Sequence, residues 1–206
     1  GRGKQSLNPS GMWYSAQSGI WQTVWMEWVP AAYVVDMTMI PDIDNDKLDL
    51  VLKVSELKGR VVITSSNQDL IKDFSLDKIK DDKLYVTINL NKYTLWTPEN
   101  PILNFINIEY GKDSFSTYFA MRHFGVENDE KGVPRLTLNH KPYFMNGVLD
   151  QGYYPESLMT PPSDAAMIND IETIKSMGFN MIRKHCKVEP MRWYFHCDRL
   201  GMIVWQ

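Results

Sequence analysis

The sequence has only two cysteines, Cys186 and Cys197, and none in residues 1–185. A framework of disulfides therefore cannot hold that part of the chain together. An antibody-type domain with a disulfide between its two sheets is excluded there as well. The packing of apolar side chains has to stabilise the fold.

The sequence also lacks long apolar runs and an excess of basic charge. No stretch approaches the roughly 20 apolar residues that cross a bilayer, and residues 1–10 do not show the charged-then-apolar pattern of a signal peptide. The formal net charge is −3, with scattered Lys and Arg, so neither nucleic acid nor a membrane is an expected partner. A signal upstream stays possible, and a periplasmic or secreted location is favoured over a cytoplasmic one.

What the chain does have is the composition of a globular protein. Of its 206 residues, 44% are hydrophobic and 23% are charged, which suits one large or two small domains. Seven Trp and ten Tyr are many for this length. Aromatic faces suit sugar rings as well as cores, and core packing is the expected use for most of them.

Residues 30–123 carry the alternating pattern of half-buried strands. In residues 47–54 and 84–90, apolar side chains alternate with polar ones. Four more strands are predicted at residues 33–40, 60–66, 105–111 and 114–124, with turn segments between them. Short strands at this spacing predict an immunoglobulin-like β-sandwich.

The periodicity changes after residue 124. A hairpin is predicted over residues 135–149, and a loop then leads to Ser163, which is placed to cap a helix that ends at Gly178. Residues 179–185 read as a strand with apolar residues on both faces, as in a parallel sheet covered by helices.

A second helix and a third strand complete this segment. Pro190 opens the helix, Gly201 closes it, and residues 202–206 form the strand. The alternation of strands and helices predicts the start of a doubly wound α/β fold or of a (β/α) barrel. At the other end of the chain, residues 18–30 are predicted to form one strand with bulky residues on both faces. One strand cannot bury itself, so we expect it to be the last strand of a domain whose earlier part precedes residue 1.

Several segments, in this order, resemble the family 2 glycoside hydrolases, the group of β-galactosidases, β-glucuronidases and β-mannosidases. They are GKQ, SGIWQTVWMEWVP, LWTPENP, FAMRHFGV, the stretch from KPYFMNGVLDQGYYP to NMIRKH, and WYFHCDRLGMIVWQ. The resemblance implies a sugar-binding jelly roll that ends in residues 1–29, the sandwich in residues 30–123, and the N-terminal part of a catalytic (β/α)8 barrel in residues 124–206. It also implies a retaining, exo-acting β-glycosidase similar to β-galactosidases. No cofactor is expected.

Four residues are candidates for binding the carbohydrate substrate: Asp150, Gln151, Arg183 and His185. They follow apolar runs, and barrels bind ligands at the carboxyl ends of their strands. Arg183 could donate paired hydrogen bonds to a sugar or keep a carboxylate ionised, and His185 could bind a hydroxyl group. The alternative is a structural salt bridge for Arg183 and a structural role for His185. The resemblance favours the functional role of Arg183, because the family carries a pocket Arg in the pattern N-x-x-R.

The sugar stays open, because the motifs depart from those of the family. The sequence GVLDQG stands where β-galactosidases and β-glucuronidases have GVNRHE, and His185 follows Arg183 by two residues instead of three. The closing MIVWQ resembles the β-mannosidases. A β-mannosidase or β-glucuronidase specificity is therefore an alternative, and so is a non-catalytic carbohydrate-binding or structural module. The oligomeric state is not predicted.

Two other groups of residues are not assigned to chemistry. His185 with Cys186 and His196 with Cys197 are not expected to bind zinc, because adjacent residues point in different directions and each pair offers one ligand. Asp150, Glu156 and Glu189 could suggest a carboxylate pair. The catalytic glutamates of the family follow the fourth and seventh barrel strands, however, so we expect them beyond Gln206 and no catalytic residue in this chain.

Overall fold

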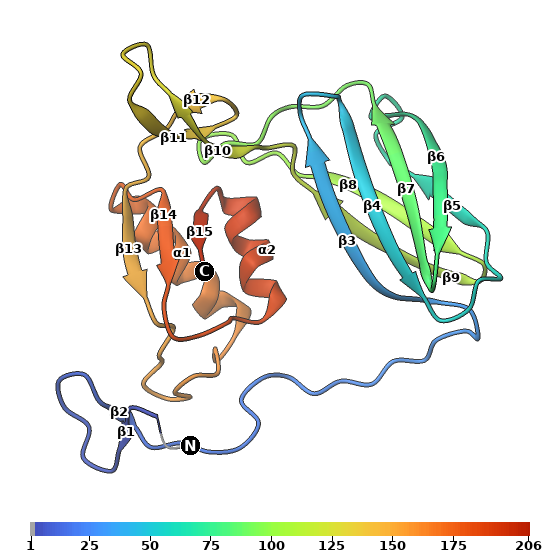
Figure 1. Cartoon of the computed structure of the whole chain (residues 1–206). Helices are drawn as coiled ribbons and strands as arrows, with labels where there is room; N and C mark the ends of the chain where they lie inside the picture. The colour runs from blue at the N-terminus through green and yellow to red at the C-terminus, as the bar shows by residue number, and fades with distance from the viewer. Residues whose placement is uncertain (1–2) are drawn as a thin grey trace. The chain divides into compact units, whose positions relative to one another are not determined.

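A computed structural model describes residues 3–206, and Gly1 and Arg2, the start of the predicted segment 1–29, lie outside the described residues. The chain divides into two compact units (Figure 1). One contains the N-terminal residues up to Met26 together with Asn146–Gln206, and the other is Glu27–Met145. The predicted domain boundaries at residues 29 and 123 stay predictions.

The unit Glu27–Met145 contains an antiparallel sandwich of two sheets. One sheet has the order β3-β4-β7-β6 and the other has the order β5-β8-β9, which is the arrangement of a constant-type immunoglobulin sandwich. The strands are β3 (Val34–Asp42), β4 (Lys47–Val54), β5 (Val61–Thr64), β6 (Ile71–Lys80), β7 (Lys83–Leu90), β8 (Asn104–Tyr110) and β9 (Asp113–Phe119). The predicted sandwich is therefore confirmed.

The core of the sandwich follows from the alternation in its strands. Leu48, Leu50 and Leu52 of β4 are almost completely buried, and they lie opposite apolar residues of β7 in the register of the sheet. Side chains from β5 and β8 of the other sheet complete the same cluster. Alternation places every apolar residue of such a strand on one face.

Two details of the sandwich differ from the prediction. Strand β6 was not predicted, because bulges between Ile71 and Asp73 and between Leu76 and Lys78 break its alternation. The single strand predicted over residues 114–124 is wrong: β9 ends at Phe119, and the chain then enters a different, three-stranded sheet. That sheet consists of β10 (Phe124–Asn128), β11 (Pro134–Leu138) and β12 (Lys141–Pro142).

The C-terminal residues form a parallel sheet of order β13-β14-β15 with two helices. The elements are β13 (Gly147–Asp150), α1 (Asp164–Ser176), β14 (Met181–Lys184), α2 (Met191–Leu200) and β15 (Ile203–Trp205). The Ser163 hydroxyl accepts a hydrogen bond from the amide of Ala166, as a helix cap does. Gly178 and Gly201 have positive φ after the two helices. Pro190 is the cap residue of α2, one position before the predicted one.

Both helices pack on one face of this sheet. Met167 and Ile171 of α1 and Trp193 of α2 form a buried cluster with Ile182 of β14. In the described residues the three strands form an open sheet, and no barrel closes. None of the described helices is long and apolar enough to cross a membrane.

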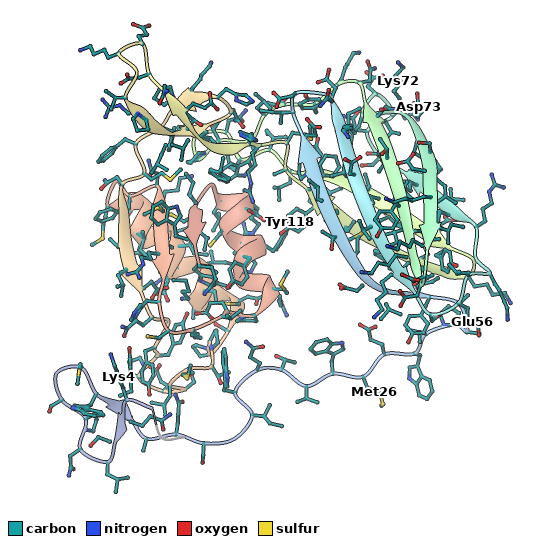
Figure 2. The ribbon with its side chains drawn as sticks, viewed as in Figure 1. Lys4, Met26, Glu56, Lys72, Asp73 and Tyr118 are labelled. Carbon is teal, nitrogen blue, oxygen red and sulfur yellow. The ribbon has the colours of Figure 1, made fainter. Side chains whose placement is uncertain are left out.

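Residues 18–30 form no strand with the described residues, and their pairing with an earlier part of a jelly roll stays a prediction. The segment is extended but pairs with no described strand, and Trp28 is 94% exposed. A strand requires a hydrogen-bonding partner, and none of the described residues supplies one here. Met26, labelled in Figure 2, lies on this segment. Before it, β1 (Gln5–Ser6) and β2 (Tyr14–Ser15) form a short parallel pair.

Candidate functional site

The predicted binding residues lie at the carboxyl ends of β13 and β14, but they do not all lie on the same face of the sheet. In the register of the sheet, Arg183 lies between Leu149 and Trp205, and all three are exposed on the face that the helices leave uncovered. Asp150 pairs with the buried Lys184 instead. The structure therefore places Arg183 and Asp150 on opposite faces.

Arg183 is open to a ligand. Within residues 3–206, its side chain makes no hydrogen bond or ion pair with another described residue, although an arginine has five N–H donors. The alternative role, a salt bridge at the end of the strand, is therefore not present among the described residues.

Gln151 and His185 contact each other. The amide nitrogen of Gln151 is 3.1 Å from Nδ1 of His185, and Sγ of Cys186 is 3.0 Å from the same nitrogen. The expectation that adjacent His and Cys side chains point apart is wrong for this pair. The pair lies after β14 has ended, and Cys186 has φ +62°, which turns the chain back.

A cavity of about 300 Å³ adjoins these residues. The segment around β1 and β2 contributes part of its wall, and the loop after β13 contributes another part. The pKa of Tyr14 is raised, first by burial and then by the charge of Cys186 and a hydrogen bond with that residue. The lining includes Tyr14, Gln17, Gln151, Tyr153, Cys186 and Lys187.

Behind the exposed face lies a buried ion cluster of Asp150, Lys184, Lys187 and Glu189. Nζ of Lys184 is 2.5 Å from Oδ2 of Asp150 and 2.6 Å from Oε1 of Glu189. Nζ of Lys187 is 2.9 Å from the same Glu189 oxygen and donates to the carbonyl oxygen of Gly152 at 2.6 Å. Both lysine side chains and that of Glu189 are almost completely buried. Burial lowers the pKa of Lys187, against the charge of Glu189, which raises it.

This buried ion cluster joins the ends of two strands to the loop that precedes α2. Both of its carboxylates bind the Lys184 ammonium group, so Asp150 and Glu189 have a structural role here, and the binding of substrate by Asp150 stays a prediction. Glu156, the third carboxylate considered, is exposed.

Sequence reasoning did not assign Lys184 or the N-terminal segment to the site. The signal for Lys184 was available, because the residue after an exposed Arg in a strand faces the opposite, helix-covered side. Its ammonium group lies 4.5 Å from the centre of the Trp193 ring. No sequence signal predicted that Trp21 lies beside Lys187, at 5.4 Å from ring centre to Nζ.

The chain is similar in sequence to two known β-galactosidases. No model of a protein family matches the sequence. A β-galactosidase of Vibrio vulnificus (strain YJ016) is 26% identical over 216 residues, which covers 96% of this chain and 21% of that protein. A β-galactosidase of Lactococcus lactis subsp. lactis (strain IL1403) is 27% identical over 94% of this chain and 19% of that protein.

A solved structure agrees with these two sequences. The GH2 β-galacturonidase from Eisenbergiella tayi bound to galacturonate has a TM-score of 0.63 at 18% identity, covering 86% of this chain and 32% of that one. The chain is similar to a segment of the family 2 β-glycosidases.

The resemblance that the motifs indicate is thereby confirmed. The chain spans about a fifth of the length of the two curated relatives. The sequence similarity runs through both the sandwich and the α/β segment.

Proposed function

We propose that this chain is part of a retaining, exo-acting β-glycosidase and that its α/β segment is the first part of a catalytic (β/α)8 barrel. The observation that carries the proposal is similarity to β-galactosidases over 94% to 96% of the chain. The parallel order of β13, β14 and β15, with helices on one face only, is what the first strands of such a barrel require.

In this proposal the uncovered face of the sheet is the inner wall of the barrel. Arg183 then projects towards the substrate and donates hydrogen bonds to it or to a catalytic carboxylate. Gln151 and His185, which hold each other in place, contact a sugar hydroxyl group. Asp150 acts indirectly: it binds Lys184 and thereby fixes the end of β13.

The substrate is a terminal β-linked sugar. A β-galactoside is favoured, because the two curated relatives are named β-galactosidase. A β-glucuronide or a β-mannoside is the alternative. The two catalytic carboxylates come from chain segments other than residues 3–206, and a periplasmic or secreted location belongs to the same proposal.

The test is an assay of the longest open reading frame that contains this chain. The purified protein is incubated with nitrophenyl β-galactoside, β-glucuronide and β-mannoside, and the anomer released first is identified by NMR. Hydrolysis of one of them with retention supports the proposal. Binding of a sugar without turnover of any of the three would support the non-catalytic module instead.

The 206-residue chain by itself is a second test. It should hydrolyse none of the three glycosides, because three open strands cannot hold a sugar ring between two carboxylates and exclude water. Turnover that survives repurification and disappears in Asp150→Asn or Glu189→Gln would place a catalytic pair inside this chain and overturn the structural role given to them here.

A further inference from the structure

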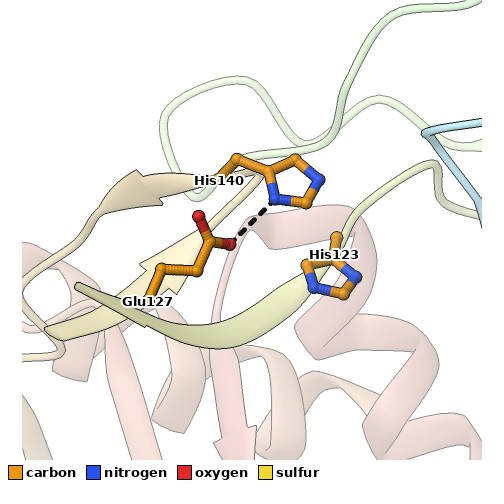
Figure 3. Close-up of side chains that lie close together, drawn as sticks. All are labelled: His123, Glu127 and His140. Atoms are coloured by element: carbon orange, nitrogen blue, oxygen red, sulfur yellow. Dashed lines mark hydrogen bonds and ion pairs between the residues drawn. The ribbon is translucent and has the colours of Figure 1, made fainter. Parts of the chain in front are cut away.

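The sheet of β10, β11 and β12 brings together two histidines and a glutamate (Figure 3). One ligand atom from each of His123, Glu127 and His140 lies within 4.8 Å of the other two. None of these residues was considered as a ligand from the sequence, since His140 is separated from the other two by a hairpin.

The pattern of β10 places two of the ligands on one face. Gly125 and Glu127 of β10 and His123, the residue before the strand, follow each other at every second position, so they face the same side. A Cβ atom on Gly125 would lie 3.0 Å from Nε2 of His123 and 3.5 Å from Oε1 of Glu127. Both donor atoms, and the Thr137 hydroxyl oxygen at 3.1 Å from the same point, therefore face one space, which a side chain at position 125 would fill.

The third ligand comes from the tight turn between β11 and β12. Leu138 pairs with Lys141, and the two residues between them, Asn139 and His140, both have positive φ, at 52° and 63°. Glycine is the residue usually preferred at such positions. The conformation of His140 places its ring against that of His123, with ring centres 4.7 Å apart, and its Nδ1 lies 2.8 Å from Oε1 of Glu127.

The other ring nitrogen of His140, Nε2, lies beside a second carboxylate. Nε2 lies 2.9 Å from Oδ1 of Asp44, in the turn between β3 and β4. When Nε2 donates its N–H to Asp44, the lone pair of Nδ1 faces the Glu127 carboxylate, and either a proton or a metal cation can lie between these two acceptors. A carboxylate on the outer nitrogen is also the usual partner of a metal-binding histidine.

We propose that His123, Glu127 and His140 form a binding site for a divalent transition metal, with Zn²⁺ as the best match, and that Asp44 orients His140. Two imidazoles and a carboxylate are a common zinc ligand set, and a water molecule would take the fourth position. A tetrahedral ion with bonds of about 2.1 Å separates its ligands by about 3.4 Å. The three ligand atoms lie within 4.8 Å of one another, so metal binding would require the His123 and His140 side chains to rotate to this spacing. The metal would join the hairpin to the β3–β4 turn of the same compact unit.

The experiment is calorimetric titration of the 206-residue chain with ZnCl₂ at neutral pH. We expect one Zn²⁺ per chain and a rise in melting temperature with zinc. His140→Gly removes the ligand without straining the turn, since glycine favours positive φ. It should abolish binding while leaving the melting temperature without zinc unchanged or higher. Asp44→Asn should weaken binding by about 10- to 100-fold.

Two further variants separate this site from other uses of zinc. Gly125→Ala retains all three ligands but fills the space between them, and it should also lose binding. Cys186→Ser removes the thiol beside His185 and should bind zinc as the unchanged chain does. The proposal is overturned if the unchanged chain takes up no zinc, if binding survives His140→Gly and His123→Ala, or if it is lost only in Cys186→Ser.

Discussion

Replacing Glu189 by Gln tests the buried ion cluster directly. The substitution retains the size of the side chain and removes the one charge that both lysines share. Lys184 retains Asp150, whereas Lys187 loses its carboxylate partner in the cluster and retains only uncharged acceptors, the carbonyl oxygen of Gly152 and the amide oxygen of Gln. Both lysine side chains and that of Glu189 are almost completely buried, so the lost charge is poorly replaced by solvent. Removing one partner of a buried ion pair typically costs about 3–5 kcal/mol, and we expect a loss of this size.

Hydrogen exchange followed by mass spectrometry is the suitable assay, because it measures stability separately for each segment of a chain with two units. The amides of β14 and β15 should exchange faster by the factor that corresponds to this loss, while those of β4 and β7 in the sandwich stay unchanged. Glu156→Gln is the matched control. Glu156 is exposed, so its substitution should change the free energy of opening by no more than about 0.5 kcal/mol.

The same cluster allows a second test. The double variant Lys187→Met and Glu189→Leu replaces a buried pair by apolar groups of similar size, and it should recover most of the lost stability. A loss below about 1 kcal/mol in Glu189→Gln, the typical value for an exposed pair, would refute the assignment of Glu189 as the shared anion. So would a double variant less stable than the single one.

Three other predictions concern separate parts of the molecule. Burial and the charge of Arg199 lower the pKa of His196 from its ordinary value of 6.5. The stability that the neutral imidazole contributes should therefore be lost as the pH falls below 6.5. In urea titrations at several pH values, His196→Gln should make the free energy of unfolding less dependent on pH. Gly59→Ala would place a Cβ atom 2.6 Å from the buried ring of Tyr110, and it should cost about 1–3 kcal/mol; an unchanged melting temperature would contradict this. In the longer protein, Arg183→Ala should lower kcat/KM by roughly 10²-fold with no change in melting temperature. Unchanged kinetics there would show that Arg183 does not contact the substrate.

The sandwich could be predicted from the sequence because its signal is local. In β4 and β7, strict alternation over eight residues each determines which face is buried. Strand β6 shows the limit of this reasoning. Its two bulges shift the alternation of apolar and polar residues. Nine of its ten residues are exposed, so the strand has no buried face that would impose a regular apolar pattern on its sequence.

The candidate site shows the same limit at the level of single residues. Arg183 was found from the sequence because it follows an apolar run at the end of a strand, and the alternation of that strand fixes the face on which it lies. The partners of its neighbours were not predictable. Lys187, Glu189 and Gly152 contact each other through a loop whose path depends on packing against α2 and the N-terminal segment.

The sequence by itself determined the strands with regular alternation, the helix caps at Ser163 and Gly201, and the resemblance to family 2 β-glycosidases. Each of these depends on residues within a few positions of each other along the chain. Only the tertiary structure decided that residues 18–30 pair with no described strand, that two lysines share Glu189, and that His140 lies against Glu127. These contacts join residues from different segments, and the free energy of burial and hydrogen bonding that selects them depends on the whole packed unit.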